Sequence, residues 1–67
     1  TNVAVAIRML ESIEAIAGAT EAADDRAALR RHAEMIARGA REAVPDPDDR
    51  IAVETRAAAA HRALAAG

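Results

Sequence analysis

The sequence predicts an all-α protein: a small, close-packed, alanine-rich bundle of three antiparallel helices. Alanine accounts for 21 of the 67 residues, and it has the lowest cost of any residue in a helix because it loses no side-chain freedom. Helix-start and helix-stop signals enclose three segments, at about residues 2–17, 25–43 and 47–65. The short connections between them favour antiparallel neighbours. We therefore expect a single helical domain over residues 1–67.

The first segment should begin at Asn2, a favourable capping residue, and end at Gly18, which can adopt a left-handed stop conformation. Its apolar residues cover roughly 200° of the helix, more than a single buried stripe needs, and we expect it to be the most buried helix. The main face comprises Val3, Ala6, Ile7, Leu10, Ile13 and Ala17.

A second apolar stripe extends beyond this main face. It consists of Val5, Met9, Ser12 and Ile16. The small Ser12 allows close approach, and flexible Met9 suits an imperfect partner. We predict that this stripe contacts another protein surface. The alternative is a slightly rotated helix that buries Met9 and Ile16 and leaves Val3 partly exposed.

The second segment should be capped by Asp24, or start one turn earlier at Thr20. One face holds the expected core residues, with Met35 and Val44 at its margins: Ala28, Leu29, His32, Ala33, Ile36, Gly39, Ala40 and Ala43. A histidine in this position should be buried and neutral, and Gly39 should mark the close approach of a neighbouring backbone. The opposite face predicts a ladder of ion pairs, Arg30–Glu34, Glu34–Arg38 and Arg38–Glu42.

The third segment has the clearest boundaries. Pro45 should end the preceding helix, because the residue before a proline avoids the helical region. Asp46 should cap the next helix, with Pro47 at its first position and two acidic residues, Asp48 and Asp49, in its first turn. A narrow seam of Val53, Ala57, Ala60 and Leu64 implies close helix packing.

The composition argues against catalysis and against a bound cofactor. The chain has no Cys, Phe, Tyr, Trp or Lys, which removes most nucleophiles and stacking surfaces. His32 and His61 have no second metal ligand three or four residues on, so we expect no metal site. The paired carboxylates lie at helix starts, and no glycine-rich phosphate loop is present. We expect a protein that is not an enzyme.

Nucleic-acid binding is the alternative function, through five arginines of the second segment: Arg26, Arg30, Arg31, Arg38 and Arg41. Three short helices can form a helix-turn-helix. Two acidic residues in the first turn of the third helix would then meet the phosphates, and the net charge of the chain is −2. This charge disfavours a nucleic-acid partner.

Three strings carry a resemblance to a known family: AIRMLESI at residues 6–13, RRHAEMI at 30–36 and AVPDPDDR at 43–50. The chain resembles, from about Val3 to Arg56, the carboxy-terminal soluble tail of a bacterial family of predicted membrane proteins of unknown function. The resemblance implies a cytoplasmic appendage, tethered to the inner membrane through its parent protein. It implies no site residue.

These observations predict a non-catalytic helical interaction or structural module of a larger bacterial protein. The chain opens on Thr1 rather than Met, which indicates a piece of a longer polypeptide, and the use of Arg alone among basic residues with abundant Ala indicates a GC-rich bacterial genome. The longest apolar run is five residues, at positions 3–7, so the segment itself should not span a membrane. Its expected partner is the remainder of the parent chain or a second copy of itself, as a homo-oligomer.

Overall fold

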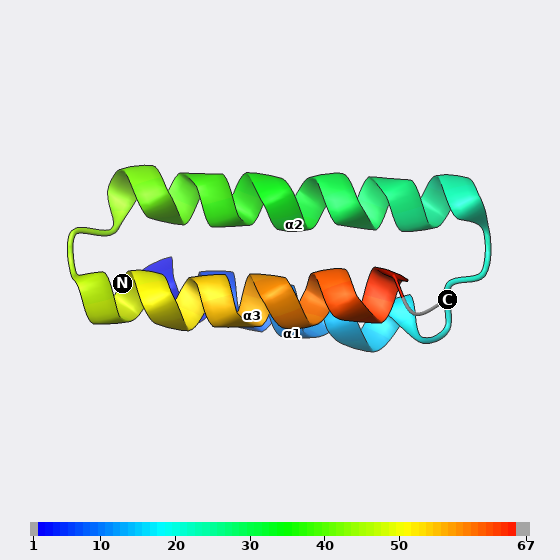
Figure 1. Ribbon diagram of the computed structural model, residues 1–67, viewed down its shortest axis with the longest axis horizontal. Helices are drawn as coiled ribbons and strands as arrows, with labels where there is room; N and C mark the ends of the chain where they lie inside the picture. Colours follow the sequence, from blue (N-terminus) through cyan, green and yellow to red (C-terminus); the bar gives the residue numbers. More distant parts are fainter. Residues whose placement is uncertain (1, 66–67) are drawn as a thin grey trace.

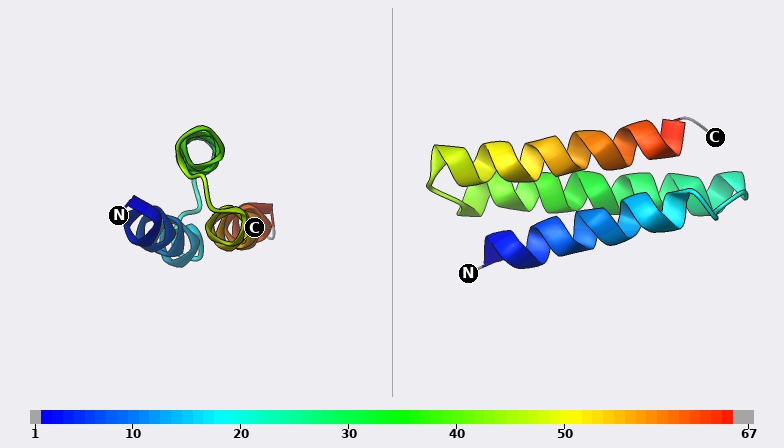
Figure 2. Two further views of the ribbon diagram at one scale, coloured as in Figure 1. Left: turned by 90° about the vertical axis from the view of Figure 1, so that its left-hand side faces the viewer. Right: turned by 90° about the horizontal axis from the view of Figure 1, so that it is seen from below.

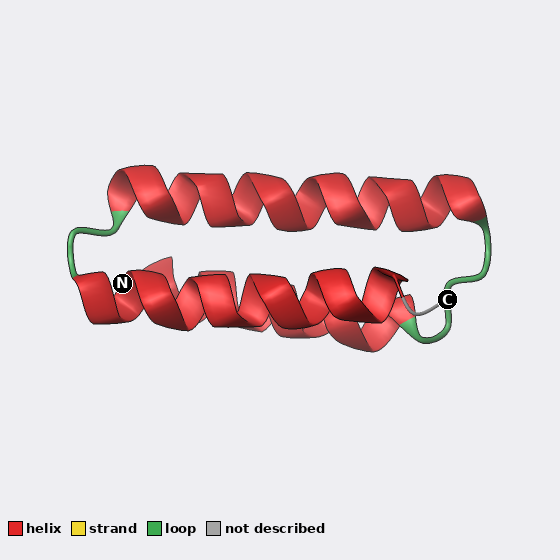
Figure 3. Cartoon of the chain, viewed as in Figure 1, coloured by secondary structure: helices red, strands yellow, loops and turns green. Residues whose placement is uncertain are grey.

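The computed structural model describes residues 2–65 and contains three α-helices (Figure 3). They are α1 (Asn2–Ala17), α2 (Ala23–Ala43) and α3 (Pro47–Ala65). The predicted all-α fold class is confirmed, and residues 2–65 include no strand. The bounds of α1 and α3 match the sequence prediction, whereas α2 begins two residues before the expected start. The side chain of Asn2, the predicted cap of α1, lies outside the described part of the structure.

The three helices form a bundle of triangular cross-section (Figure 2). Successive helices reverse direction, so α1 and α3 run parallel to each other and antiparallel to α2 (Figure 1). The bundle is elongated, and its Cα atoms extend over 36 × 16 × 14 Å. One end therefore collects the carboxyl ends of α1 and α3 and the amino end of α2. The bundle has three long sides, each formed by two helices.

The core is built largely from alanine. Among the described residues, only Leu10, Val53 and Leu64 are large side chains with essentially no exposed surface. Around them lie one more large residue, Ile13, and buried alanines from every helix: Ala17, Ala33, Ala37, Ala40, Ala57 and Ala60. The predicted α3 seam is confirmed at all four positions. Because α3 has more buried positions than α1, the expectation that the first helix is the most buried is wrong.

The buried face of α2 differs from the predicted face. Ala33 and Ala40 are buried as expected, but Ala37 is also buried, while His32, Gly39 and Ala43 are exposed. The apolar face of α2 is wider than the strip it buries, and contact with α3 rotates Ala37 inward. A helical wheel cannot anticipate this rotation when most of the candidate positions are alanine or glycine. The prediction that His32 is a core histidine is therefore wrong.

The backbone amides in the loop between α1 and α2 form hydrogen bonds other than those of the predicted glycine stop. No residue described has a positive φ, so Gly18 does not adopt the left-handed stop conformation. Instead, the amides of Ala19 and Thr20 donate to the carbonyls of Ile16 (2.9 Å) and Ala17 (3.3 Å). The hydroxyl of Thr20 also donates to the Ile16 carbonyl at 2.8 Å. These bonds tighten the last turn of α1.

The start of α2 also lacks the predicted cap. The residue at the capping position is Ala22, which makes no side-chain hydrogen bond. Asp24 and Asp25 lie inside the first turn, where their negative charges favour the positive end of the helix dipole. The helix starts earlier than Asp24 because Ala22 already accepts a hydrogen bond from the Arg26 amide at 3.0 Å.

The start of α3 confirms the sequence prediction. Val44 is extended ahead of Pro45, and its amide donates to the Ala40 carbonyl at 2.9 Å. Asp46 Oδ1 then accepts from the amide of Asp48 at 2.8 Å. Pro47 occupies the first helical position, where a missing N–H costs nothing.

Asp46→Ala should destabilise the domain by about 1 kcal/mol, because it leaves one orphan amide of α3 without its acceptor. In a domain of this size, that loss corresponds to a melting temperature lower by about 4–8 °C. Thermal denaturation followed by circular dichroism measures the shift. The matched control is Asp49→Ala, which removes a first-turn carboxylate but leaves the cap in place. An unchanged melting temperature for Asp46→Ala would contradict the assigned capping role.

Gly39→Ala should stabilise the domain by about 1 kcal/mol, the difference in helix cost between the two residues. The predicted close backbone approach at Gly39 is absent: a Cβ built at this described position meets no heavy atom within 4 Å. The backbone φ is not positive, so alanine adopts it without strain. Chemical denaturation of the variant beside the parent measures the gain. A loss of stability would show that a side chain at this position is not tolerated.

Candidate protein-contact face

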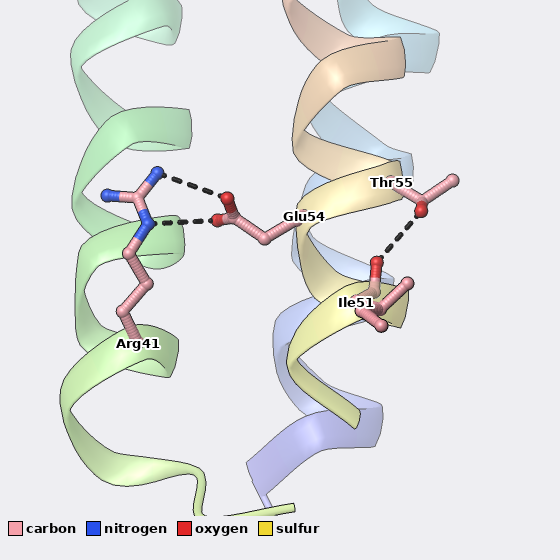
Figure 4. A network of polar contacts seen from close by, with 4 residues as sticks. All are labelled: Arg41, Ile51, Glu54 and Thr55. Carbon is pink, nitrogen blue, oxygen red and sulfur yellow. Dashed lines mark hydrogen bonds and ion pairs between the residues drawn. The ribbon is translucent and has the colours of Figure 1, made fainter. Parts of the chain in front are cut away.

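Two of the three sides of the bundle carry ion pairs between helices. On the α2–α3 side, Arg41 Nε lies 3.2 Å from Glu54 Oε1, and Arg41 Nη2 donates to Glu54 Oε2 at 3.4 Å (Figure 4). On the α1–α3 side, Arg56 lies 3.7 Å from Glu11 and 3.9 Å from Glu14. These exposed pairs contribute little stability, but they make both sides polar.

The predicted ion-pair ladder along α2 is wrong. Within residues 2–65, none of the pairs Arg30–Glu34, Glu34–Arg38 and Arg38–Glu42 comes within ion-pair distance. The acidic partner that Arg41 uses lies on α3, which the spacing along one helix cannot reveal.

The third side, which we call the α1–α2 face, has no ion pair among the described residues. It carries a groove of about 270 Å³ whose lining contains no ionisable side chain. The lining residues are Val5, Ala6 and Met9 from α1, and Ile36, Gly39, Ala40, Ala43 and Val44 from α2. Glycine and alanine at these α2 positions leave space between the helices that larger side chains would fill.

The predicted contact stripe of α1 borders this groove. Val5, Met9 and Ile16 remain 53%, 45% and 51% exposed, and Ser12 is exposed as well. Val5 and Met9 line the groove directly, and Ile16 continues the same line one turn beyond Ser12. The alternative of a rotated α1 that buries Met9 and Ile16 is wrong.

Helix α2 adds two exposed residues, one predicted at the margin of its buried face and one predicted in the core. Met35 is 65% exposed, and it lies one turn from Gly39 on the same side of α2. His32, a further turn back, is also exposed. The excess apolar surface of α2 thus borders that of α1. The sequence signal for it was Met35, a large apolar residue at the margin of the predicted α2 face.

The five arginines of the predicted nucleic-acid patch have different surroundings. Arg26 is half-buried and donates to backbone carbonyls of α1, of the first loop and of α3. Arg41 is paired with Glu54. Arg30, Arg31 and Arg38 are exposed on α2, and Arg38 lines the α2–α3 side.

The residues considered for chemistry are not brought together. His61 is half-buried and lines an open groove of about 380 Å³ between α2 and α3, together with Glu34 and Glu54. His32 does not line that groove. In the described part of the chain, no group of three His, Cys, Asp or Glu side chains has the geometry to hold a metal.

Two threonine hydroxyl groups donate hydrogen bonds to backbone carbonyls four residues earlier in the chain. Thr55 Oγ1 donates to the Ile51 carbonyl at 2.8 Å within α3 (Figure 4), as Thr20 does at the end of α1. Thr1 lies outside the described residues. Ser12 is exposed to solvent within the apolar stripe of α1.

Comparison with known proteins identifies no relative of this chain. The chain matches no protein-family model, no curated protein and no solved structure. Over residues 2–65, none of the three helices combines the length and apolar character needed to cross a lipid bilayer.

Proposed function

We propose that this chain is a non-catalytic helical module for protein–protein interaction, and that its contact surface is the α1–α2 face. One observation carries the proposal: the two polar sides of the bundle have ion pairs between helices, whereas the third side is apolar and grooved. Large apolar side chains are left exposed together on this side. An apolar patch on a small domain is typical of an interaction surface.

The chemistry of the surface supports a helical partner. The α1 stripe supplies a ridge, and small residues of α2 beside it supply a hollow. Ridges and grooves of this kind are the elements through which helices pack on one another. A helix with apolar residues every three or four positions would bury Met9 and Ile16 without bringing a charge against them.

We place the module in a larger bacterial protein, at the cytoplasmic side of the inner membrane. The resemblance of residues 6–13, 30–36 and 43–50 to the tails of predicted membrane proteins supports this setting. The alternative, nucleic-acid binding, retains Arg30, Arg31 and Arg38 as exposed contacts. Its signature would be an affinity that falls steeply with salt, whereas an apolar helix contact responds little.

The proposal is tested by replacing Ser12 with a photo-crosslinking amino acid in the cells that produce the protein. We expect a defined protein adduct, identified by mass spectrometry, from Ser12 and not from Arg62, an exposed position on α3. Adding Met9→Glu and Ile16→Glu should abolish the adduct while the domain stays folded, because both side chains are about half exposed.

The matched control adds the same two charges away from the stripe, at Ala4 on α1 and Ala58 on α3, both exposed. Ala4→Glu with Ala58→Glu should leave the Ser12 adduct in place. Equal adducts from Ser12 and Arg62, or none from either, would refute the proposed contact surface. Unfolding of the Met9→Glu, Ile16→Glu chain would show that the stripe belongs to the core.

A further inference from the structure

The α1 stripe has the spacing of a coiled-coil seam. Val5, Met9, Ser12 and Ile16 follow one another at intervals of four, three and four residues, which are the steps between successive a and d positions of a heptad. Ser12 and the three apolar side chains are all exposed, so the seam is open along its length. A seam of this kind is completed by another helix with the same spacing.

We infer that the occupant of this seam is α1 of a second copy of the chain, packed antiparallel across a two-fold axis. The inference rests on the proposed function and names its partner. In this register, Val5 of one copy lies opposite Ile16 of the other, and Met9 lies opposite Ser12. Each contact occurs twice, as a two-fold interface requires.

The antiparallel direction fits the sizes of the side chains. It places the long, flexible Met9 against the small Ser12 in both central layers. A parallel pair would place Met9 against Met9 and Ser12 against Ser12, which crowds one layer and leaves space in the other. Layers of complementary volume pack at higher density.

The flanking residues favour the same direction. Arg8 and Ala15 lie on one flank of the seam, and Ala6 and Ile13 lie on the other. Antiparallel pairing brings Arg8 against the exposed Ala15, so no like charges oppose each other on that flank. Parallel pairing would bring the Arg8 guanidinium against Ile13, an apolar residue that belongs to the core.

The acidic residues of α1 do not oppose the pairing. Glu11 and Glu14 lie on the α3 side of the helix, where Arg56 contacts both carboxylates. They therefore stay away from the two-fold axis. The groove beside the seam is lined by Val5, so it adds room for Ile16 of the second copy, because nothing lies within 4 Å of the Cβ position of Gly39.

The size of the face sets the strength of the dimer. The seam offers only four contact positions per copy, on a helix of 16 residues, whereas a standard stable interface uses about 20–30 residues a side. The dimer should therefore be weak, and its population should depend on concentration. The experiment must detect a transient pair and define its register.

Cysteine cross-linking does both, because the natural chain has no cysteine. Val5→Cys and Ile16→Cys are prepared as separate chains, one of them isotope-labelled, and oxidised alone and as a mixture. The antiparallel register predicts a mixed disulfide between the two variants. Each variant alone should cross-link poorly, since eleven residues of helix separate like positions by about 16 Å, and a disulfide requires Cα atoms within about 7 Å.

The matched control is Ile51→Cys, an exposed apolar position on α3. The mixed disulfide should form roughly tenfold faster than the Ile51→Cys disulfide, because the dimer raises the effective concentration of the paired thiols. A second pair in the same register, Met9→Cys with Ser12→Cys, should also cross-link faster than the Ile51→Cys control, and it covers the case in which one variant of the first pair fails to fold.

Cross-linking of Val5→Cys with itself faster than with Ile16→Cys would overturn the antiparallel register. Rates equal to the Ile51→Cys control for both pairs would overturn self-association through this seam. That second outcome, together with a Ser12 photo-adduct to a different protein, would leave the proposed interaction function standing. Absence of both the mixed disulfide and the photo-adduct would refute the two proposals together.

Discussion

Replacing Arg26 with alanine should destabilise the domain by about 2–3 kcal/mol, because a part-buried guanidinium then no longer joins the ends of two helices. Arg26 Nη1 donates to the carbonyls of Ala17 (3.3 Å) and Thr20 (2.9 Å). Its Nη2 donates to the carbonyls of Ala63 (3.2 Å) and Leu64. One side chain of α2 thus donates to backbone carbonyls at the carboxyl ends of both α1 and α3.

The helix dipoles strengthen this contact. Because α1 and α3 run parallel, their carboxyl ends lie at the same end of the bundle (Figure 1). Each end carries partial negative charge, and a cation placed there is stabilising. The planar fork of arginine can reach several carbonyls at once, which a lysine ammonium cannot match.

Thermal denaturation should therefore show a melting temperature lower by about 10–20 °C for Arg26→Ala. Arg30→Ala provides the control, since Arg30 is exposed one turn further along α2 and its loss should change stability little. Arg26→Lys should recover only part of the loss. Similar melting temperatures for the Arg26→Ala and Arg30→Ala variants would contradict the assigned role.

Ala60→Leu should destabilise the domain by about 2–3 kcal/mol through overpacking. Ala60 and Ala33 have no exposed surface, so a larger side chain at Ala60 must force helices apart or adopt a strained rotamer. Leucine and alanine both favour helix. The loss would therefore report packing rather than helix propensity.

Comparing the chemical denaturation of Ala60→Leu with that of Ala58→Leu separates the effect of overpacking from the effect of introducing a leucine into α3. Ala58 is exposed on the same helix, so the second variant should be close to the parent in stability. If both variants were as stable as the parent, the α3 seam would not be in close contact with its neighbours.

Local signals determined much of this structure. Pro45, Asp46 and Pro47 act through their own backbone geometry and a hydrogen bond across two residues, so the start of α3 could be predicted without any knowledge of the other helices. The α3 seam and the exposed α1 stripe were also predicted correctly. In both helices, large apolar side chains recur at helical spacing. The face that they share can therefore be recognised from the sequence alone.

The surface of α2 depended on the tertiary structure. Its candidate core positions are mostly alanine and glycine, which fit on either side of the buried boundary, so packing against α3 decided that Ala37 is buried and that His32 and Gly39 are exposed. This rotation completes the apolar α1–α2 face.

Contacts between distant residues were likewise decided only by the folded chain. Arg26 bonds carbonyls 37 and 38 residues away, and Arg41 pairs with Glu54 rather than with a neighbour on its own helix. Spacing along one helix describes which residues share a face of that helix. Which helix end or carboxylate that face meets depends on how the three helices pack, and the packing here is set by the whole core.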